Sequence, residues 1–147
     1  MVGWASDLGH NLGKAMTRMG IDITSVKRLQ GLAERRPRAL TRLFTANEVA
    51  DAGSGRQRWA RLAARFAAKE AIIKAAEGLH GGAYRDIEVR RRPGGPPGVS
   101  VSGPLRKWLQ HKGYGVFLSL SHEDEFAVAL AVLEGKEGES SVARMDS

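Results

Sequence analysis

Apolar residues recur every three or four positions in two long parts of the chain, and this spacing predicts a helix in each. The first spans residues 24–36, where Thr24 or Ser25 can cap it, and the second spans residues 56–77 and ends at Gly78. The inward-facing residues are Val26, Leu29, Leu32 and Ala33 in the first helix and Trp59, Leu62, Phe66 and Ile73 in the second.

Three shorter helices are predicted from capping signals. Pro37 can begin a helical turn, and Thr45 with Glu48 forms a capping box for another short helix. The pair Gly103-Pro104 begins a third, which ends at Gly113. Their apolar residues are Leu40, Leu43 and Phe44 after Pro37, and Leu105, Trp108 and Leu109 in the third.

Apolar residues with strand-like patterning predict strands at residues 19–23, 86–91, 99–102, 115–121 and 126–133. Four polar residues separate the last two, which predicts an antiparallel hairpin. The order of elements predicts an α+β fold, in which one long and several short helices pack on one antiparallel sheet.

A chain of 147 residues that is 42% hydrophobic can bury one core, so we expect a single domain over residues 19–135. Residues 1–18 show weak periodicity and are expected to form a flexible, dispensable extension. Residues 136–147 are small and polar, and they predict a disordered tail.

Two absences from the sequence restrict the class of protein. There is no cysteine, so disulfides, thiolate metal sites and cysteine nucleophiles are excluded, as fits a reducing cytoplasm. No stretch approaches the roughly 18 to 20 apolar residues that span a bilayer, so we expect a cytoplasmic protein without a membrane segment.

The net charge of +7 predicts an anionic partner, and basic residues concentrate in the first half of the chain. A solvated helix face explains such a cluster about as well as a binding surface does. Nucleic acid, an acidic protein and a phosphorylated ligand therefore all remain open. The basic residues are Lys27, Arg28, Arg35, Arg36, Arg38, Arg42, Arg56, Arg58, Arg61 and Arg65.

Three acidic and basic residues in apolar surroundings are candidates for a site. Glu70 and Lys74 lie one turn apart on the second long helix, where an ordinary surface ion pair is the simplest explanation. Asp22 lies in an apolar strand, where it can cap the following helix. A hard divalent cation needs only one or two carboxylates besides water and phosphate, so Asp22 with Glu70 would also suffice as its ligands.

Three blocks in order resemble the holo-acyl-carrier-protein synthases of the 4′-phosphopantetheinyl transferase family. They are residues 20–23 (GIDI), residues 65–71 (RFAAKEA) with Lys74-Ala75, and residues 119–122 (SLSH). Phe44-Thr45 with Glu48 and residues 86–89 (DIEV) are weaker matches. The central block is specific, whereas the first and the last are weak alone.

The resemblance implies a phosphopantetheinyl transferase fold and transfer of 4′-phosphopantetheine from coenzyme A to a serine of apo acyl carrier protein. It implies that Asp22 and Glu70 hold Mg²⁺, which Mn²⁺ could replace, and that Lys74 contacts phosphate. Glu70 then accepts the serine proton, directly or through a metal-bound water. His122 and Arg65 are implied contacts for the coenzyme A phosphates.

The resemblance also implies a homotrimer with active sites between subunits, and docking of the acidic carrier on Arg28, with Lys27, Arg35 and Arg36 as helpers. It gives no role to nucleic acid. The alternatives are a basic nucleic-acid-binding module, which explains the charge but not Asp22 and Glu70, and a catalytically idle trimeric scaffold.

Overall fold

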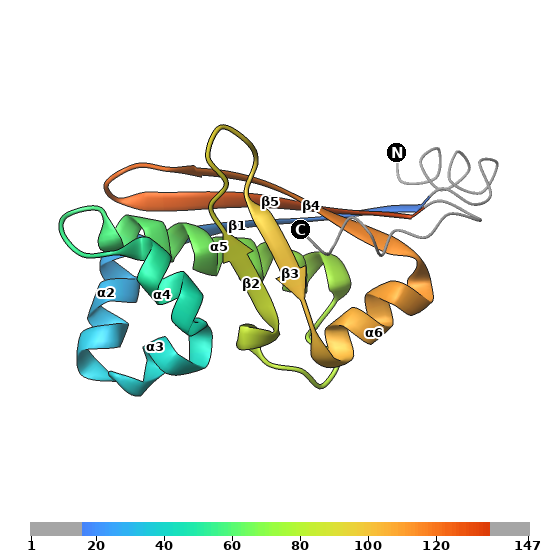
Figure 1. Cartoon of the computed structure of the whole chain (residues 1–147), viewed down its shortest axis with the longest axis horizontal. Coiled ribbons are helices and arrows are strands. Elements are labelled where there is room, and N and C mark those ends of the chain that lie inside the picture. Colours follow the sequence, from blue (N-terminus) through green and yellow to red (C-terminus); the bar gives the residue numbers. More distant parts are fainter. Residues whose placement is uncertain (1–15, 136–147) are drawn as a thin grey trace, which may run out of the picture.

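A long helix running along a three-stranded sheet organises the protein (Figure 1). The computed structural model describes residues 16–135. The helix is α5 (Arg58–Ala76), and the sheet has the order β1 (Met16–Ser25), β5 (Phe126–Gly135), β4 (Tyr114–His122), with both pairs antiparallel. The predicted α+β class and the predicted terminal hairpin are therefore confirmed.

A second, two-stranded sheet consists of β2 (Ile87–Arg90) and β3 (Gly98–Val101). The sequence predicted one sheet, so this part of the prediction is wrong. The physical reason lies at Val89, whose N–H donates to the Glu48 carboxylate and whose carbonyl accepts from Arg65. Side chains of the neighbouring helices thus occupy the backbone groups that another strand would need.

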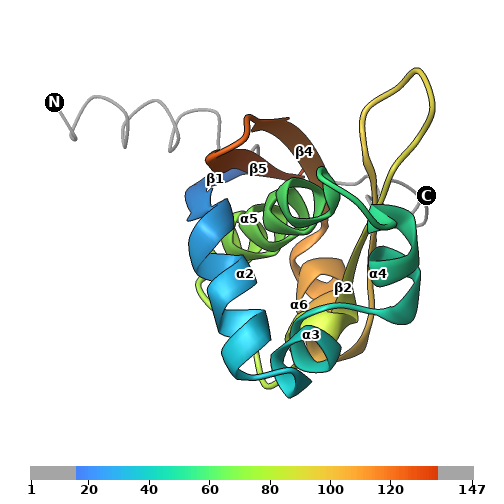
Figure 2. The ribbon, with the colours of Figure 1, turned by 90° about the vertical axis from the view of Figure 1, so that its left-hand side faces the viewer.

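The short helices are α2 (Val26–Arg35), α3 (Arg38–Leu43), α4 (Ala46–Ala52) and α6 (Gly103–Lys112), with a 3₁₀ turn, η1, at Tyr84–Asp86. Of the short helices, α2 and α4 pack against α5, α3 packs against α2, and α6 packs against β4. Ser25 caps α2 through its hydroxyl, and the predicted capping box of Thr45 and Glu48 is present at α4. Figure 2 shows α2 on one side of α5 and α4 with β2 on the other.

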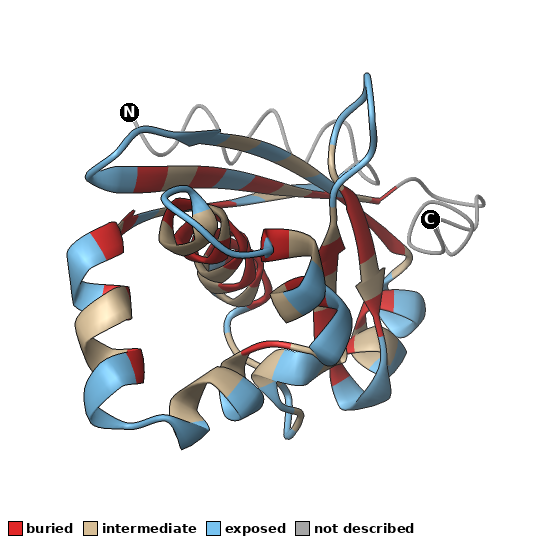
Figure 3. Cartoon of the chain, turned by 60° about the vertical axis from the view of Figure 1, so that its left-hand side comes forward, coloured by how far each residue is buried: buried red, intermediate tan, exposed pale blue. Residues whose placement is uncertain are grey.

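Small residues allow α5 to lie close to the sheet. Its buried face is largely alanine, and it packs against β1 and against β5, whose inner positions 127, 129 and 131 are also alanine (Figure 3). At the closest approach, a Cβ added to Gly20 of β1 would lie 2.0 Å from the Ala71 carbonyl oxygen. Gly20 therefore fixes the position of β1 against α5, two residues before Asp22.

The first strand begins at Met16, three residues before the predicted start. Met16, Thr17 and Arg18 pair with β5, and the Arg18 guanidinium donates to the Ala75 carbonyl at 2.7 Å. These three residues are therefore part of the sheet, and a truncation at Met19 would remove their pairing. The rest of the predicted extension, residues 1–15, and the predicted tail, residues 136–147, lie outside the described residues.

Candidate active site

Asp22 of β1 and Glu70 of α5 line the same cavity, which we call cavity 1. Its volume is about 630 Å³, and it lies between β1, α2 and α5. Lys27, Arg28 and Arg35 of α2 add three cationic side chains to the two carboxylates. The remaining lining residues are Ile23, Thr24, Ser25, Leu29, Leu32 and Phe66.

The Asp22 carboxylate is held by hydrogen bonds to both of its oxygens. Lys74 Nζ donates to Oδ1 at 2.9 Å and to the Ile21 carbonyl at 3.0 Å, while the Thr24 hydroxyl donates to Oδ2 at 2.9 Å. The α2 cap is Ser25, so Asp22 does not have the capping role that the sequence left open. Asp22 is instead a preorganised carboxylate at the edge of cavity 1.

Glu70 does not use Lys74 as its partner, although the two lie four residues apart. Its Oε1 accepts a hydrogen bond of 2.5 Å from the Tyr84 hydroxyl, and Lys74 pairs with Asp22. Burial, followed by the hydrogen bond and charge of Glu70 and the charge of Asp22, raises the pKa of Tyr84 to about 12. The Tyr84 hydroxyl therefore keeps its proton at neutral pH and donates a hydrogen bond to Glu70.

The donor set at cavity 1 fits a hard divalent cation. Among residues 16–135 no group of three or more histidine, cysteine, aspartate or glutamate side chains could hold a metal ion. Magnesium does not need such a group, because it is usually bound by one or two carboxylates together with water and substrate phosphates. Asp22 and Glu70 supply two carboxylates from separate elements to one cavity, which matches that requirement.

Arg65 and His122 lie together in a different cavity, cavity 2, which shares no lining residue with cavity 1. Cavity 2 has a volume of about 460 Å³ and is strongly basic. Arg65 is buried and donates to the carbonyls of Val89 and Arg61, and burial lowers its pKa. The other charged lining residues are Arg61, Arg90, Arg91 and Arg92. Within one chain, Arg65 and His122 are thus separate from the carboxylates, whereas Lys74, the third predicted phosphate contact, pairs with Asp22.

The four predicted docking residues divide between two cavities. Lys27, Arg28 and Arg35 line cavity 1 beside the carboxylates. Arg36 lines a third cavity, of about 570 Å³, together with Arg38 and Arg42. Leu32 lines both of these cavities, so the third cavity is a neighbour of cavity 1.

Comparison with known proteins identifies the family. Residues 18–131 match the family model described as the 4′-phosphopantetheinyl transferase superfamily. The chain belongs to this superfamily. The match covers all of α5 and β4 and most of β1 and β5, and it includes the three blocks of the sequence resemblance. The predicted family and the predicted class of enzyme, a transferase, are confirmed.

Two curated relatives and one solved structure show how closely this superfamily member follows the family. The holo-acyl-carrier-protein synthase of Desulforudis audaxviator is 42% identical to this chain, over 80% of this chain and 92% of its own length. That of Carboxydothermus hydrogenoformans is 43% identical, over 80% of this chain and 98% of its own length. A crystal structure of the Bacillus anthracis synthase, in complex with CoA (3′,5′-ADP), superposes with a TM-score of 0.66. It is 35% identical and covers 81% of this chain and 96% of its own.

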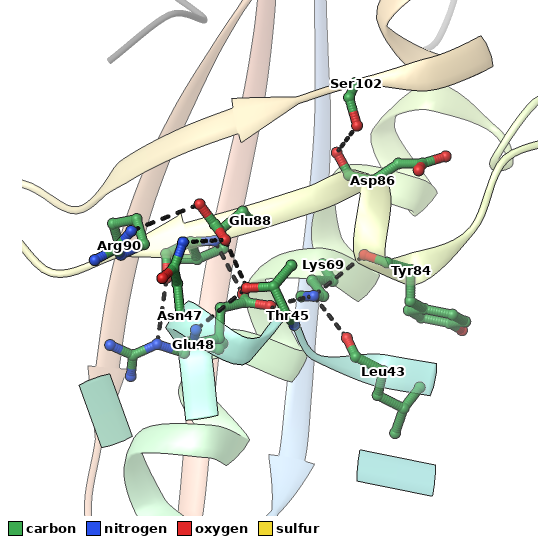
Figure 4. A network of polar contacts seen from close by, with 12 residues as sticks. Leu43, Thr45, Asn47, Glu48, Lys69, Tyr84, Asp86, Glu88, Arg90 and Ser102 are labelled. Atoms are coloured by element: carbon green, nitrogen blue, oxygen red, sulfur yellow. Dashed lines mark hydrogen bonds and ion pairs between the residues drawn. The ribbon is translucent and has the colours of Figure 1, made fainter. Parts of the chain in front are cut away.

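A buried polar network supports the site of this transferase, and its residues were not predicted to have this role (Figure 4). Lys69 is fully buried, and its ammonium donates to Glu48 Oε1 at 2.7 Å and to the carbonyls of Leu43 at 2.6 Å and Tyr84 at 3.1 Å. Burial lowers the pKa of Lys69, and the Glu48 carboxylate opposes that shift. The sequence feature that could have revealed the burial of Lys69 is its spacing, since it lies three residues after Phe66 and four before Ile73 on the apolar face of the helix.

Proposed function

We propose that the chain is a holo-acyl-carrier-protein synthase that transfers 4′-phosphopantetheine from coenzyme A to a serine of apo acyl carrier protein at cavity 1. The observation that carries this proposal is the convergence of Asp22 and Glu70 from β1 and α5 on one cavity, beside the cations of α2. The similarity to holo-acyl-carrier-protein synthases over most of both chains supports the same substrates. It favours the transferase over a nucleic-acid-binding module as the explanation of the basic helices.

The transfer is a substitution at the β-phosphorus of coenzyme A. The carrier serine oxygen forms a bond to this phosphorus, the bond to the bridging oxygen breaks, and adenosine 3′,5′-bisphosphate leaves. Glu70 takes the proton of the serine hydroxyl, directly or through water. Lys74, which is half exposed beside Asp22, stabilises negative charge on the phosphoryl oxygens.

Magnesium fits this site, with Asp22 and Glu70 as its protein ligands. When bound, it supplies Lewis-acid stabilisation of charge on the phosphoryl oxygens, and Mn²⁺ can take its place at oxygen ligands. The protein's part is to hold the two carboxylates in place. Lys74 and Thr24 do this for Asp22.

A homotrimer would bring the two separated cavities together. One face of the three-stranded sheet carries Met19, Ile21, Ile23, Phe117 and Leu130, which are 37% to 68% exposed. They are neighbours across the strands, because Ile21 pairs with Leu130, and Val132 pairs with both Met19 and Phe117. Such a patch favours association with other copies of the chain.

In the trimer, Arg65 and His122 of a neighbouring subunit contact the coenzyme A phosphates. Light scattering should therefore give a mass three times the 15.9 kDa of one chain.

The transfer itself is tested by intact-mass spectrometry of an apo acyl carrier protein incubated with this protein and coenzyme A. The carrier should gain one phosphopantetheine group when Mg²⁺ is present and none when the metal is chelated, because charge on the phosphoryl oxygens is then not stabilised. Carrier proteins that all stay unmodified with Mg²⁺ present would contradict the proposed function.

Reversing the charge at Arg28 tests the docking surface. Arg28→Glu is expected to raise the KM for the carrier about tenfold with little change in kcat, because a charge at the rim of a site steers association more than chemistry. Steady-state kinetics at low and high salt measure this effect, which should shrink as salt screens the charges. Lys107→Glu on α6 is the matched control, since it makes the same charge change at another exposed position. An unchanged KM in Arg28→Glu would move docking elsewhere.

A further inference from the structure

Tyr84 is hydrogen-bonded to Glu70, and the proposed mechanism gives Tyr84 no role. Its hydroxyl donates to Glu70 Oε1 at 2.5 Å. Glu70 lines cavity 1, but Tyr84 is not among the residues that line it. The hydroxyl therefore contacts a carboxylate of cavity 1 from a residue that does not itself line the cavity.

Tyr84 is itself fixed from two directions. Its ring stacks on Phe66, with centroids 5.8 Å apart and an angle of 22° between the planes. Its carbonyl accepts a hydrogen bond of 3.1 Å from the buried Lys69. Lys69 and Glu70 are consecutive residues of α5, so one residue holds the Tyr84 backbone while the next accepts its hydroxyl. The donor is thus placed by packed groups rather than by a mobile side chain.

We propose that Tyr84 is a positioning residue for Glu70, which fixes the carboxylate through Oε1 so that Oε2 is left for the cation and the serine hydroxyl. The Tyr84 hydroxyl donates to Oε1 of the carboxylate and not to Oε2. Partners of this kind orient metal-binding carboxylates, and their loss typically lowers metal affinity or activity by about 10-fold to 100-fold. This inference rests on the proposed function, since it assigns Glu70 to the metal.

Tyr84→Phe in the full chain is the direct test, because it removes the hydroxyl and keeps the ring that stacks on Phe66. Tyr114→Phe is the matched control, as Tyr114 is the other tyrosine of the chain and its ring lies tilted against Trp108 instead. Binding of Mn²⁺ in the presence of coenzyme A, followed by electron paramagnetic resonance, should weaken about 10-fold to 100-fold in Tyr84→Phe. Its kcat should fall while the KM for the carrier stays unchanged, and Tyr114→Phe should alter neither quantity.

Glu70→Ala separates failure of this inference from failure of the proposed function. If Tyr84→Phe binds Mn²⁺ and turns over like the parent while Glu70→Ala loses both, the role of Tyr84 is overturned and the proposed function stands. Equal losses in Tyr84→Phe and Tyr114→Phe would also overturn that role, because a shared packing defect would explain them. If Glu70→Ala keeps both Mn²⁺ binding and transfer, the assignment of the metal site itself is wrong.

Discussion

Replacing Glu70 by alanine is expected to lower kcat by roughly a thousandfold, because the site loses both a proposed ligand of the metal and the proposed acceptor of the serine proton. Stabilisation of charge by a metal contributes several kcal/mol to such a transition state, and about 4 kcal/mol corresponds to three powers of ten in rate. Asp22→Ala should have a comparable effect, since it removes the other carboxylate of cavity 1. Transfer to apo acyl carrier protein at saturating coenzyme A and Mg²⁺ measures both.

Neither variant should unfold the protein. Glu70 and Asp22 are partly exposed, and neither belongs to the buried hydrophobic core. Thermal unfolding of each variant should therefore stay close to that of the parent, which separates loss of chemistry from loss of structure. Near-parental kcat in either variant would remove that residue from the proposed machinery.

Lys69→Met is expected to lower the free energy of unfolding by about 3 to 5 kcal/mol, because it leaves the Glu48 carboxylate buried without its cation. Both side chains of this pair are fully buried, and Nζ and Oε1 are 2.7 Å apart. Lys69 also donates to the carbonyls of Leu43 and Tyr84, so its loss leaves two further, partly buried acceptors without this donor. Urea unfolding followed by circular dichroism measures this change in the free energy of unfolding.

The double variant Glu48→Gln with Lys69→Met identifies the source of that loss. A neutral amide at position 48 can still accept a hydrogen bond from a backbone N–H of Thr45 or Val89, and it carries no charge. The double variant should therefore be more stable than Lys69→Met alone. A cost below about 1 kcal/mol for Lys69→Met would mean that the buried pair contributes little to the fold.

Local signals in the sequence predicted most of the fold. The capping box at Thr45 and Glu48 places the start of α4, and apolar periodicity places α2 and α5, because these features depend on neighbours in the chain. The two separate sheets were not predicted. Which strands pair depends on which groups occupy the backbone N–H and carbonyl groups along the edge of each strand. At β2, the Val89 backbone is bonded to the side chains of Glu48 and Arg65, which come from distant parts of the sequence.

The candidate site was predictable in its residues but not in its contacts. The motifs pointed to Asp22 and Glu70, and the fold brings both to one cavity. Spacing alone suggested that Glu70 pairs with Lys74, whereas the structure gives Lys74 to Asp22 and Tyr84 to Glu70. Helical spacing reports only neighbours on the same helix. It carries no information about a strand or turn that packs across them.

The position of a bound metal tests the central claim most directly. Crystals of the protein grown with Mn²⁺ and coenzyme A should give an anomalous-scattering peak bonded to carboxylate oxygens of Asp22 and Glu70, since oxygen sites for Mg²⁺ also accept Mn²⁺. A peak at that position would establish cavity 1 as the metal site of this transferase. A manganese peak bonded to neither carboxylate, with coenzyme A bound elsewhere, would contradict the account.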